Sequence, residues 1–149
     1  MAFRDITGIK FTTGEIGDSV LGSMTVRDGK IIVDPAIPTR LGDLLHDAGH
    51  LAMTEPALRP DLQRVSDDPA EEMGAIAWSV SAAIEIGMPL ETVFHKAGYK
   101  GGAQNYIDGF RTDPSIGVPY LAWLAMTAQP RRAAEWGIPA FPVMQRWLR

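Results

Sequence analysis

The stretch Leu44-Leu45-His46-Asp47-Ala48-Gly49-His50-Leu51-Ala52 lies inside the strongest helical pattern in the first half of the chain. Apolar residues recur there at helical spacing, and they predict an α-helix that is capped by Thr39 and runs to about Met53. Residues four apart share one face of a helix. His46 and His50 are spaced in this way, so together they are able to bind one metal ion if a further ligand comes from elsewhere.

Gly49 is unexpected in this helix, because a glycine in mid-helix costs about 1 kcal/mol relative to alanine. The cost indicates that something approaches the backbone closely at this point. A strand, a substrate or a second helix packed against the first would each explain the glycine.

A second helix is predicted downstream by Asp68-Pro69-Ala70-Glu71. Asp68 suits the N-cap, Pro69 the first helical position and Glu71 the capping-box position, and Gly87 is expected to end the helix. Glu72 borders the buried stripe of this helix, where a carboxylate is costly unless it is paired or bound to a metal. We therefore expect Glu72 to be the third metal ligand, with Glu71, assigned to capping, as the alternative.

The residues before the first helix are β-prone. Residues 23–27 and 30–34 predict two strands joined by a tight turn at Asp28-Gly29, and residues 3–11 predict a further strand. The sequence therefore predicts an α+β fold, in which a small N-terminal antiparallel β-sheet precedes a mostly helical core. We expect one domain over residues 1–149, with a β-rich part (1–37), a helical part (38–128) and a tail rich in Pro and Trp (129–149).

The second half of the chain predicts three further helices, over residues 89–97, 103–110 and 114–128. In the tail, Trp136 and Trp147 are expected to anchor the chain against the core. Aromatic and arginine side chains are also favoured in interfaces, so the tail is a candidate contact for a protein partner or for a homodimer.

Composition excludes several classes of function. The 149 residues include no cysteine, so a disulfide framework and a thiolate metal site are both excluded. The net charge of −4 argues against a nucleic-acid binder, which needs clustered Lys and Arg. The chain has neither a signal-peptide pattern nor an apolar run of the roughly 18 residues that span a bilayer. We therefore expect a cytoplasmic protein with no membrane or nucleic-acid partner.

Residues 44–52 resemble the zinc helix of the gluzincin metallopeptidases, whose motif is H-E-x-x-H, and in particular that of the ImmA/IrrE group. In that group the motif has the form H-E-x-G-H, and a second helix carries a metal-binding Glu in a pattern like E-A-N-x-F-A. Glu72-Met73-Gly74-Ala75-Ile76-Ala77 is similar in spacing but lacks the Asn and the Phe. The resemblance covers roughly residues 23–88.

The resemblance implies a zincin-like fold in which His46, His50 and Glu72 bind zinc, although other divalent metals also accept such ligands. It also implies a metal-activated water that hydrolyses a peptide bond in a peptide or protein substrate. The general base of the family is the Glu after the first His, and this chain has Asp47 instead. Aspartate is one methylene shorter, and a misplacement of about 1 Å costs about 100-fold in rate.

Two alternatives remain open at this point. Residues 44–50 also resemble the LLHD-x-G-H stretch of the HD-type phosphohydrolases, in which the adjacent His and Asp both bind metal. That family needs a histidine upstream, which residues 1–45 lack, and a later aspartate, for which Asp108 or Asp113 would serve. The second alternative is a catalytically weak or inactive zincin-like module with a binding or regulatory role. His95, the third histidine, is expected to form a local ion pair with Glu91.

Overall fold

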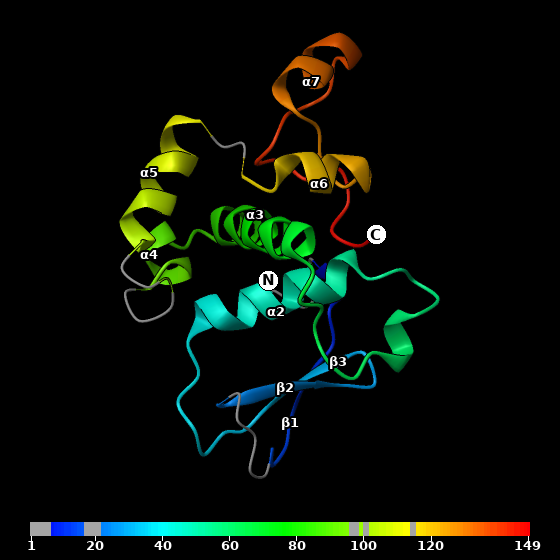
Figure 1. Cartoon of the computed structure of the whole chain (residues 1–149), viewed down its shortest axis with the longest axis vertical. Helices are drawn as coiled ribbons and strands as arrows, with labels where there is room; N and C mark the ends of the chain where they lie inside the picture. The colour runs from blue at the N-terminus through cyan, green and yellow to red at the C-terminus, as the bar shows by residue number, and fades with distance from the viewer. Residues whose placement is uncertain (1–6, 17–21, 96–98, 100–101, 114–115) are drawn as a thin grey trace.

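The computed structural model describes residues 7–16, 22–95, 99, 102–113 and 116–149. It confirms the α+β class, because a small sheet near the N-terminus is followed by helices (Figure 1). The sheet lies on one side of helix α2 and helix α3 on the other, and helices α6 and α7 lie beyond α3 (Figure 1).

The sheet contains β1 (Phe11–Thr13), β2 (Met24–Arg27) and β3 (Lys30–Val33), in the order β1-β3-β2. β2 and β3 form the expected antiparallel hairpin, and Asp28 and Gly29 in its turn have φ angles of 50° and 66°. β1 pairs with β3 in parallel, so the sheet is mixed rather than purely antiparallel. β1 adds to the hairpin along the free edge of β3, and these two strands run in the same direction. Most of the strand expected over residues 3–11 lies outside the described residues or before β1.

Helix α2 (Leu41–Met53) packs against helix α3 (Pro69–Glu85) at the centre of the molecule. Gly49 makes this contact possible, because a Cβ atom there would lie 3.1 Å from both the Cα and the carbonyl oxygen of Ala75 on α3. Of the three explanations for Gly49, helix packing is therefore the one observed. The N-cap of α2 is Arg40 rather than Thr39. The Thr39 hydroxyl instead donates a hydrogen bond to Ser23 Oγ, 2.7 Å away.

The Asp68 N-cap and the Gly87 terminus of α3 are formed as the sequence predicts. The Asp68 carboxylate accepts hydrogen bonds from the backbone N–H groups of Ala70 and Glu71, which confirms it as the N-cap. Gly87 has a φ of 73°, and its N–H donates to the carbonyl of Ile84. The left-handed conformation ends the helix.

The remaining helices differ from the expected ones in length and number, except that α5 forms where a helix is expected over 103–110. They are η1 (Arg59–Asp61), α4 (Leu90–Val93), α5 (Ala103–Thr112), α6 (Val118–Trp123) and α7 (Pro130–Trp136). The helix expected over 89–97 ends at Val93, and the one expected over 114–128 is reduced to α6. The tail expected after residue 128 contains a helix of its own, α7.

The two tail tryptophans differ. Trp147 packs edge-to-face on the buried Trp78, with 5.6 Å between ring centroids, as expected of an anchor. Trp136 is 64% exposed, so the prediction that it anchors the tail is wrong. Among the described residues, no helix is long and apolar enough to cross a membrane.

Candidate metal centre

His46, His50 and Glu72 meet at the contact between α2 and α3. His46 Nε2 lies 3.0 Å from Glu72 Oε2, and His50 Nε2 lies 2.9 Å from Glu72 Oε1. The two Nε2 atoms are 3.2 Å apart. One ligand atom from each of the three residues lies within 4.8 Å of the others, so this cluster could hold a metal ion. The structure brings together the three residues that the sequence predicts as ligands.

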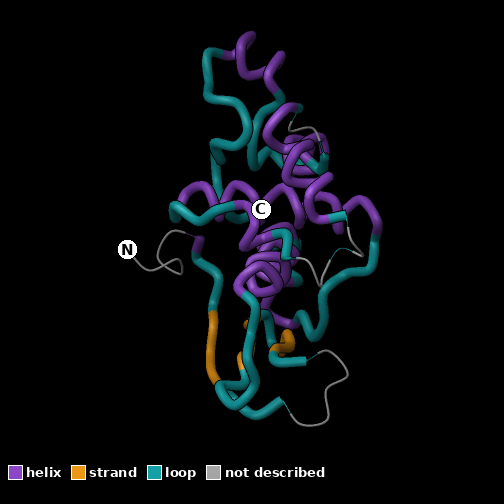
Figure 2. Tube along the Cα trace, turned by 90° about the vertical axis from the view of Figure 1, so that its left-hand side faces the viewer, coloured by secondary structure: helices purple, strands orange, loops and turns teal. Residues whose placement is uncertain are grey.

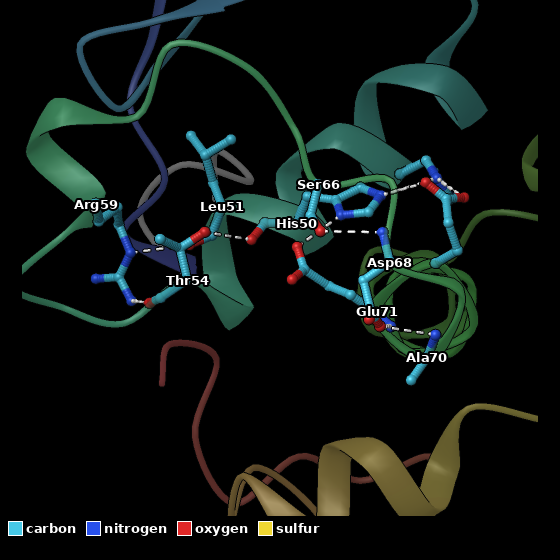
Figure 3. A network of polar contacts seen from close by, with 10 residues as sticks. His50, Leu51, Thr54, Arg59, Ser66, Asp68, Ala70 and Glu71 are labelled. Carbon is cyan, nitrogen blue, oxygen red and sulfur yellow. Dashed lines mark hydrogen bonds and ion pairs between the residues drawn. The ribbon is translucent and has the colours of Figure 1, made fainter.

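The α2–α3 packing explains how these residues meet. One turn of α2 separates the two histidines, and Glu72 lies in the first turn of α3, where the Asp68 cap fixes the start of the helix. The C-terminal end of α2 is held by hydrogen bonds from the Arg59 side chain. Arg59 Nε donates to the carbonyl of Leu51 and Arg59 Nη2 to that of Thr54, at 2.8 and 2.9 Å (Figure 3).

Glu71 does not have the capping role that the sequence predicts. Its Oε1 lies 2.9 Å from His50 Nδ1, so its carboxylate faces α2 rather than the backbone N–H of Asp68. Ser66 Oγ accepts that N–H instead, at 3.1 Å (Figure 3). An orienting carboxylate behind a ligating histidine is a common feature of metal sites. Glu71 is therefore neither a cap nor the third ligand, but the group that orients His50.

The hydrogen bonds at the cluster limit where the hydrogen atoms of His50 can lie. A carboxylate only accepts hydrogen bonds, so His50 Nδ1 must carry a hydrogen toward Glu71. If His50 is neutral, its Nε2 then presents a lone pair to Glu72 and to His46, both within 3.2 Å. The lone pair and the Glu72 carboxylate then repel each other. Either a second proton on His50 or a cation bound by the same atoms removes this repulsion. Two imidazoles and a carboxylate are a donor set that suits zinc and several other divalent metals.

The two histidines differ in their electrostatic surroundings. Burial, followed by the neighbouring His50, lowers the pKa of His46. Burial alone would also lower the pKa of His50, but the hydrogen bond that His50 donates to Glu71 and the charge of Glu72 outweigh it, and the pKa of His50 is raised. His50 is fully buried. The Nδ1 atom of His46 is buried with no hydrogen-bond partner in the described part of the chain, so this ring lacks an orienting group like Glu71.

A cavity of about 590 Å³ opens beside the cluster, and this size falls in the range of ligand-binding pockets. Its walls include His46, Asp47 and Glu72 on the two helices, Met24, Thr25 and Val26 on strand β2, and Arg64 and Tyr99. Burial raises the pKa of Asp47 to about 6. A carboxylate with a pKa in this range exchanges protons readily near neutral pH.

His95 forms a pair other than the one expected. Its Nε2 lies 2.7 Å from Asp43 Oδ1, and its Nδ1 lies 2.7 Å from Arg40 Nη1, both at the start of α2. Glu91 pairs instead with Arg111, at 2.9 Å. The predicted His95–Glu91 pair is therefore wrong. His95 does not belong to the group of potential metal ligands formed by His46, His50 and Glu72.

The residues required by the phosphohydrolase hypothesis are not gathered. Among the described residues, the one cluster of potential metal ligands contains Glu72 rather than Asp47. Asp108 accepts a hydrogen bond from Gln104 on α5, and Asp113 ends that helix.

Sequence reasoning did not identify three features of this site. It assigned Glu71 to capping, and it gave no role to Arg64 or to the cavity wall formed by β2. The two successive acids Glu71 and Glu72 could have indicated that both contact α2, because side chains in the first turn of a helix can reach a neighbouring helix.

Comparison with known proteins adds nothing to this description: no family model matches the chain, and neither a curated protein nor a solved structure matches it.

Proposed function

We propose that the protein is a metal-dependent peptidase that binds one divalent metal ion, zinc, through His46, His50 and Glu72. The observation that carries the proposal is the convergence of ligand atoms from these three side chains within 4.8 Å, beside a cavity whose wall includes His46 and Glu72. The same three residues match the ligand positions of the gluzincin motif, which supports zinc among the metals that such a donor set accepts. Zinc held by three protein ligands lowers the pKa of a bound water to about 7 and polarises a carbonyl.

We assign to Asp47 the role of proton acceptor in this reaction. It follows His46 in the sequence and lines the same cavity, and its raised pKa favours proton exchange near neutral pH. Glu71 holds the Nδ1 hydrogen of His50 and so keeps Nε2 directed at the cluster. Because Asp47 is shorter than the usual glutamate, we expect slow turnover.

A peptide is the substrate class that the cavity favours. Strand β2 forms one edge of the described sheet, and Met24, Thr25 and Val26 line the same cavity as His46 and Glu72. A sheet edge presents backbone N–H and C=O groups that can pair with an extended peptide. A peptide paired with β2 would carry its backbone past the metal ligands.

A binding or regulatory module is the second candidate function. Asp47 favours it, because the shorter side chain impairs proton transfer without affecting the three ligands. In that case the protein would bind a peptide along β2 and release it uncleaved.

Metal analysis of protein purified without a His-tag tests the proposal. We expect about one zinc ion per chain, removal by a chelator, and a rise in melting temperature when zinc is restored. His46→Ala should abolish binding, whereas His95→Ala, which alters a histidine outside the cluster, should leave the zinc content unchanged. A wild-type protein that neither contains zinc nor is stabilised by it would refute the metal site.

Cleavage is then measured separately on the zinc-loaded protein. A library of fluorescence-quenched peptides should be hydrolysed by wild-type protein, and His46→Ala should eliminate the activity. Peptides that bind without being cleaved, with zinc present, would support the binding module instead.

A further inference from the structure

The C-terminal region divides into two parts with different surroundings. The last residues pack back on the core: the Trp147 carbonyl accepts a hydrogen bond from Trp78 Nε1 at 3.1 Å, and the Arg149 N–H donates to Ala52 at 2.8 Å. Residues 129–140, which we call the arm, are mostly exposed, whereas Leu124 and Met126 just before them belong to the hydrophobic core. Figures 1 and 2 show α7, within the arm, at the end of the molecule opposite the sheet.

The base of the arm is fixed by paired backbone segments. The Gln145 N–H donates to Met126 at 2.8 Å, and the Phe141 N–H donates to Ala128 at 2.9 Å. The Thr127 hydroxyl donates to the carbonyl of Val143 at 2.8 Å. The arm therefore holds α7 in a defined position, although a helix of seven residues would be unstable in isolation.

Helix α7 is almost uncovered. Ala133 is its one buried residue. Trp136 is 64% exposed, and the side chains of Arg131 and Arg132 are 91% and 62% exposed. Arg132 lies over the Trp136 ring, 5.9 Å from its centroid. Exposed tryptophan beside arginine is the combination that is enriched at the centres of protein interfaces.

The charge of this region indicates the chemistry of a partner. Residues 116–149 contain four arginines and one glutamate, whereas residues 1–115 contain 10 basic and 17 acidic residues. The single glutamate, Glu135, lies 3.3 Å from Arg131 and 3.1 Å from Arg132. These pairs are exposed and therefore weak, so carboxylates of a partner can compete for the same guanidinium groups.

We propose that the arm is a docking site for an acidic segment of another protein, with Trp136 as the apolar anchor and Arg131 and Arg132 as the partners of its carboxylates. The acidic remainder of the chain repels an extended polyanion such as a membrane surface or a nucleic acid. A symmetric contact between two arms would place their arginines against each other. A compact acidic segment that touches only the arm meets neither obstacle.

Selection of short random peptides from a displayed library on the full-length protein tests the proposal. The recovered peptides should be rich in Asp and Glu beside apolar residues. A synthetic copy of the most enriched peptide should bind about tenfold or more weakly to Trp136→Ala and to the Arg131→Glu/Arg132→Glu double variant. The control is Arg27→Glu/Lys30→Glu, which reverses two exposed charges on the hairpin and should bind like wild type. Melting temperature and zinc content should be unchanged in all variants, so that this test is independent of the metal site.

The proposal is overturned if no peptides are recovered, if they show no excess of acidic residues, or if the arm variants bind them like wild type. Two further measurements assign the arm to other partners. A dimer seen by sedimentation that Trp136→Ala abolishes would assign it to a second copy of the chain. Binding to vesicles of phosphatidylcholine and phosphatidylserine that the double variant abolishes would assign it to a membrane.

Discussion

Glu71 Oε1 lies 2.9 Å from Nδ1 of His50, on the side of the imidazole ring opposite the cluster. This contact fixes which nitrogen of His50 carries its hydrogen, and so it directs the Nε2 lone pair toward Glu72 and His46. A residue that looks like part of a helix cap in the sequence thus orients a histidine of the candidate metal cluster.

Glu71→Gln should therefore weaken zinc binding by about 10- to 100-fold with little loss of stability. The amide oxygen still accepts the hydrogen bond, but the negative charge that polarises His50 is gone. Competition with a fluorescent zinc indicator measures the effect. Glu91→Gln is the matched control, since Glu91 pairs with Arg111 at the surface. A lower melting temperature with unchanged zinc affinity would show that Glu71 has only a structural role.

Asp68→Ala should lower the free energy of unfolding by about 1 kcal/mol, because two backbone N–H groups at the start of α3 lose their acceptor. Thermal or urea unfolding measures this. Asp67→Ala removes an exposed acid that caps no helix and should cost much less. Equal losses in the two variants would contradict the capping role of Asp68.

The parts of the fold that the sequence predicts correctly depend on local chemistry. The Asp28-Gly29 turn, the Asp68 cap and the Gly87 terminus need only a few neighbouring residues. The errors involve distant contacts. Thr39 bonds to Ser23 instead of capping α2, and β1 pairs with β3.

The site shows the same division. The spacing of His46 and His50 identifies two members of the candidate metal cluster, because a helix places residues four apart on one face. The separate roles of Glu71 and Glu72 depend on how α3 is rotated against α2, and a capping pattern does not determine that rotation. The pairing of His95 with Asp43 depends equally on how α4 packs on α2.

Gly49→Ala should destabilise the protein and weaken zinc binding, even though alanine favours helices. The new methyl group would lie 3.1 Å from the backbone of Ala75, so α3 must move away from α2 and take Glu72 with it. Gly109→Ala in α5 is the control. Its methyl group would lie 3.8 Å from its nearest neighbour, Ile116 Cδ1, and we expect a gain in stability of up to about 1 kcal/mol. Stabilisation by Gly49→Ala would show that the helices can separate at no cost.

Metal-free protein should lose stability relative to Asp47→Asn as the pH rises. The pKa of Asp47 is raised from 3.8 to about 6 by burial, so folding favours its protonated form. The resulting stabilisation is complete below about pH 4 and is lost as the pH rises through 6. Urea unfolding in the presence of a chelator should give similar stabilities for the two proteins at pH 4. At pH 7 and above, Asp47→Asn should be more stable by about 2 to 3 kcal/mol. Parallel pH profiles would contradict this assignment.

Asp47→Glu distinguishes the three hypotheses for the site. The substitution extends the carboxylate by one methylene into a cavity of about 590 Å³, which has room for it. If the protein is a peptidase, zinc content stays constant and kcat/KM on a quenched peptide rises, by as much as about 100-fold. Asp43→Glu, which changes another aspartate of the cavity wall, should not produce this rise. If Asp47 is instead a ligand, as in the phosphohydrolases, the substitution disturbs the site and metal is lost. If zinc is retained and neither wild type nor Asp47→Glu cleaves a peptide, the function of the site is binding. The metal ligands are then intact, and a glutamate at position 47 has not produced activity.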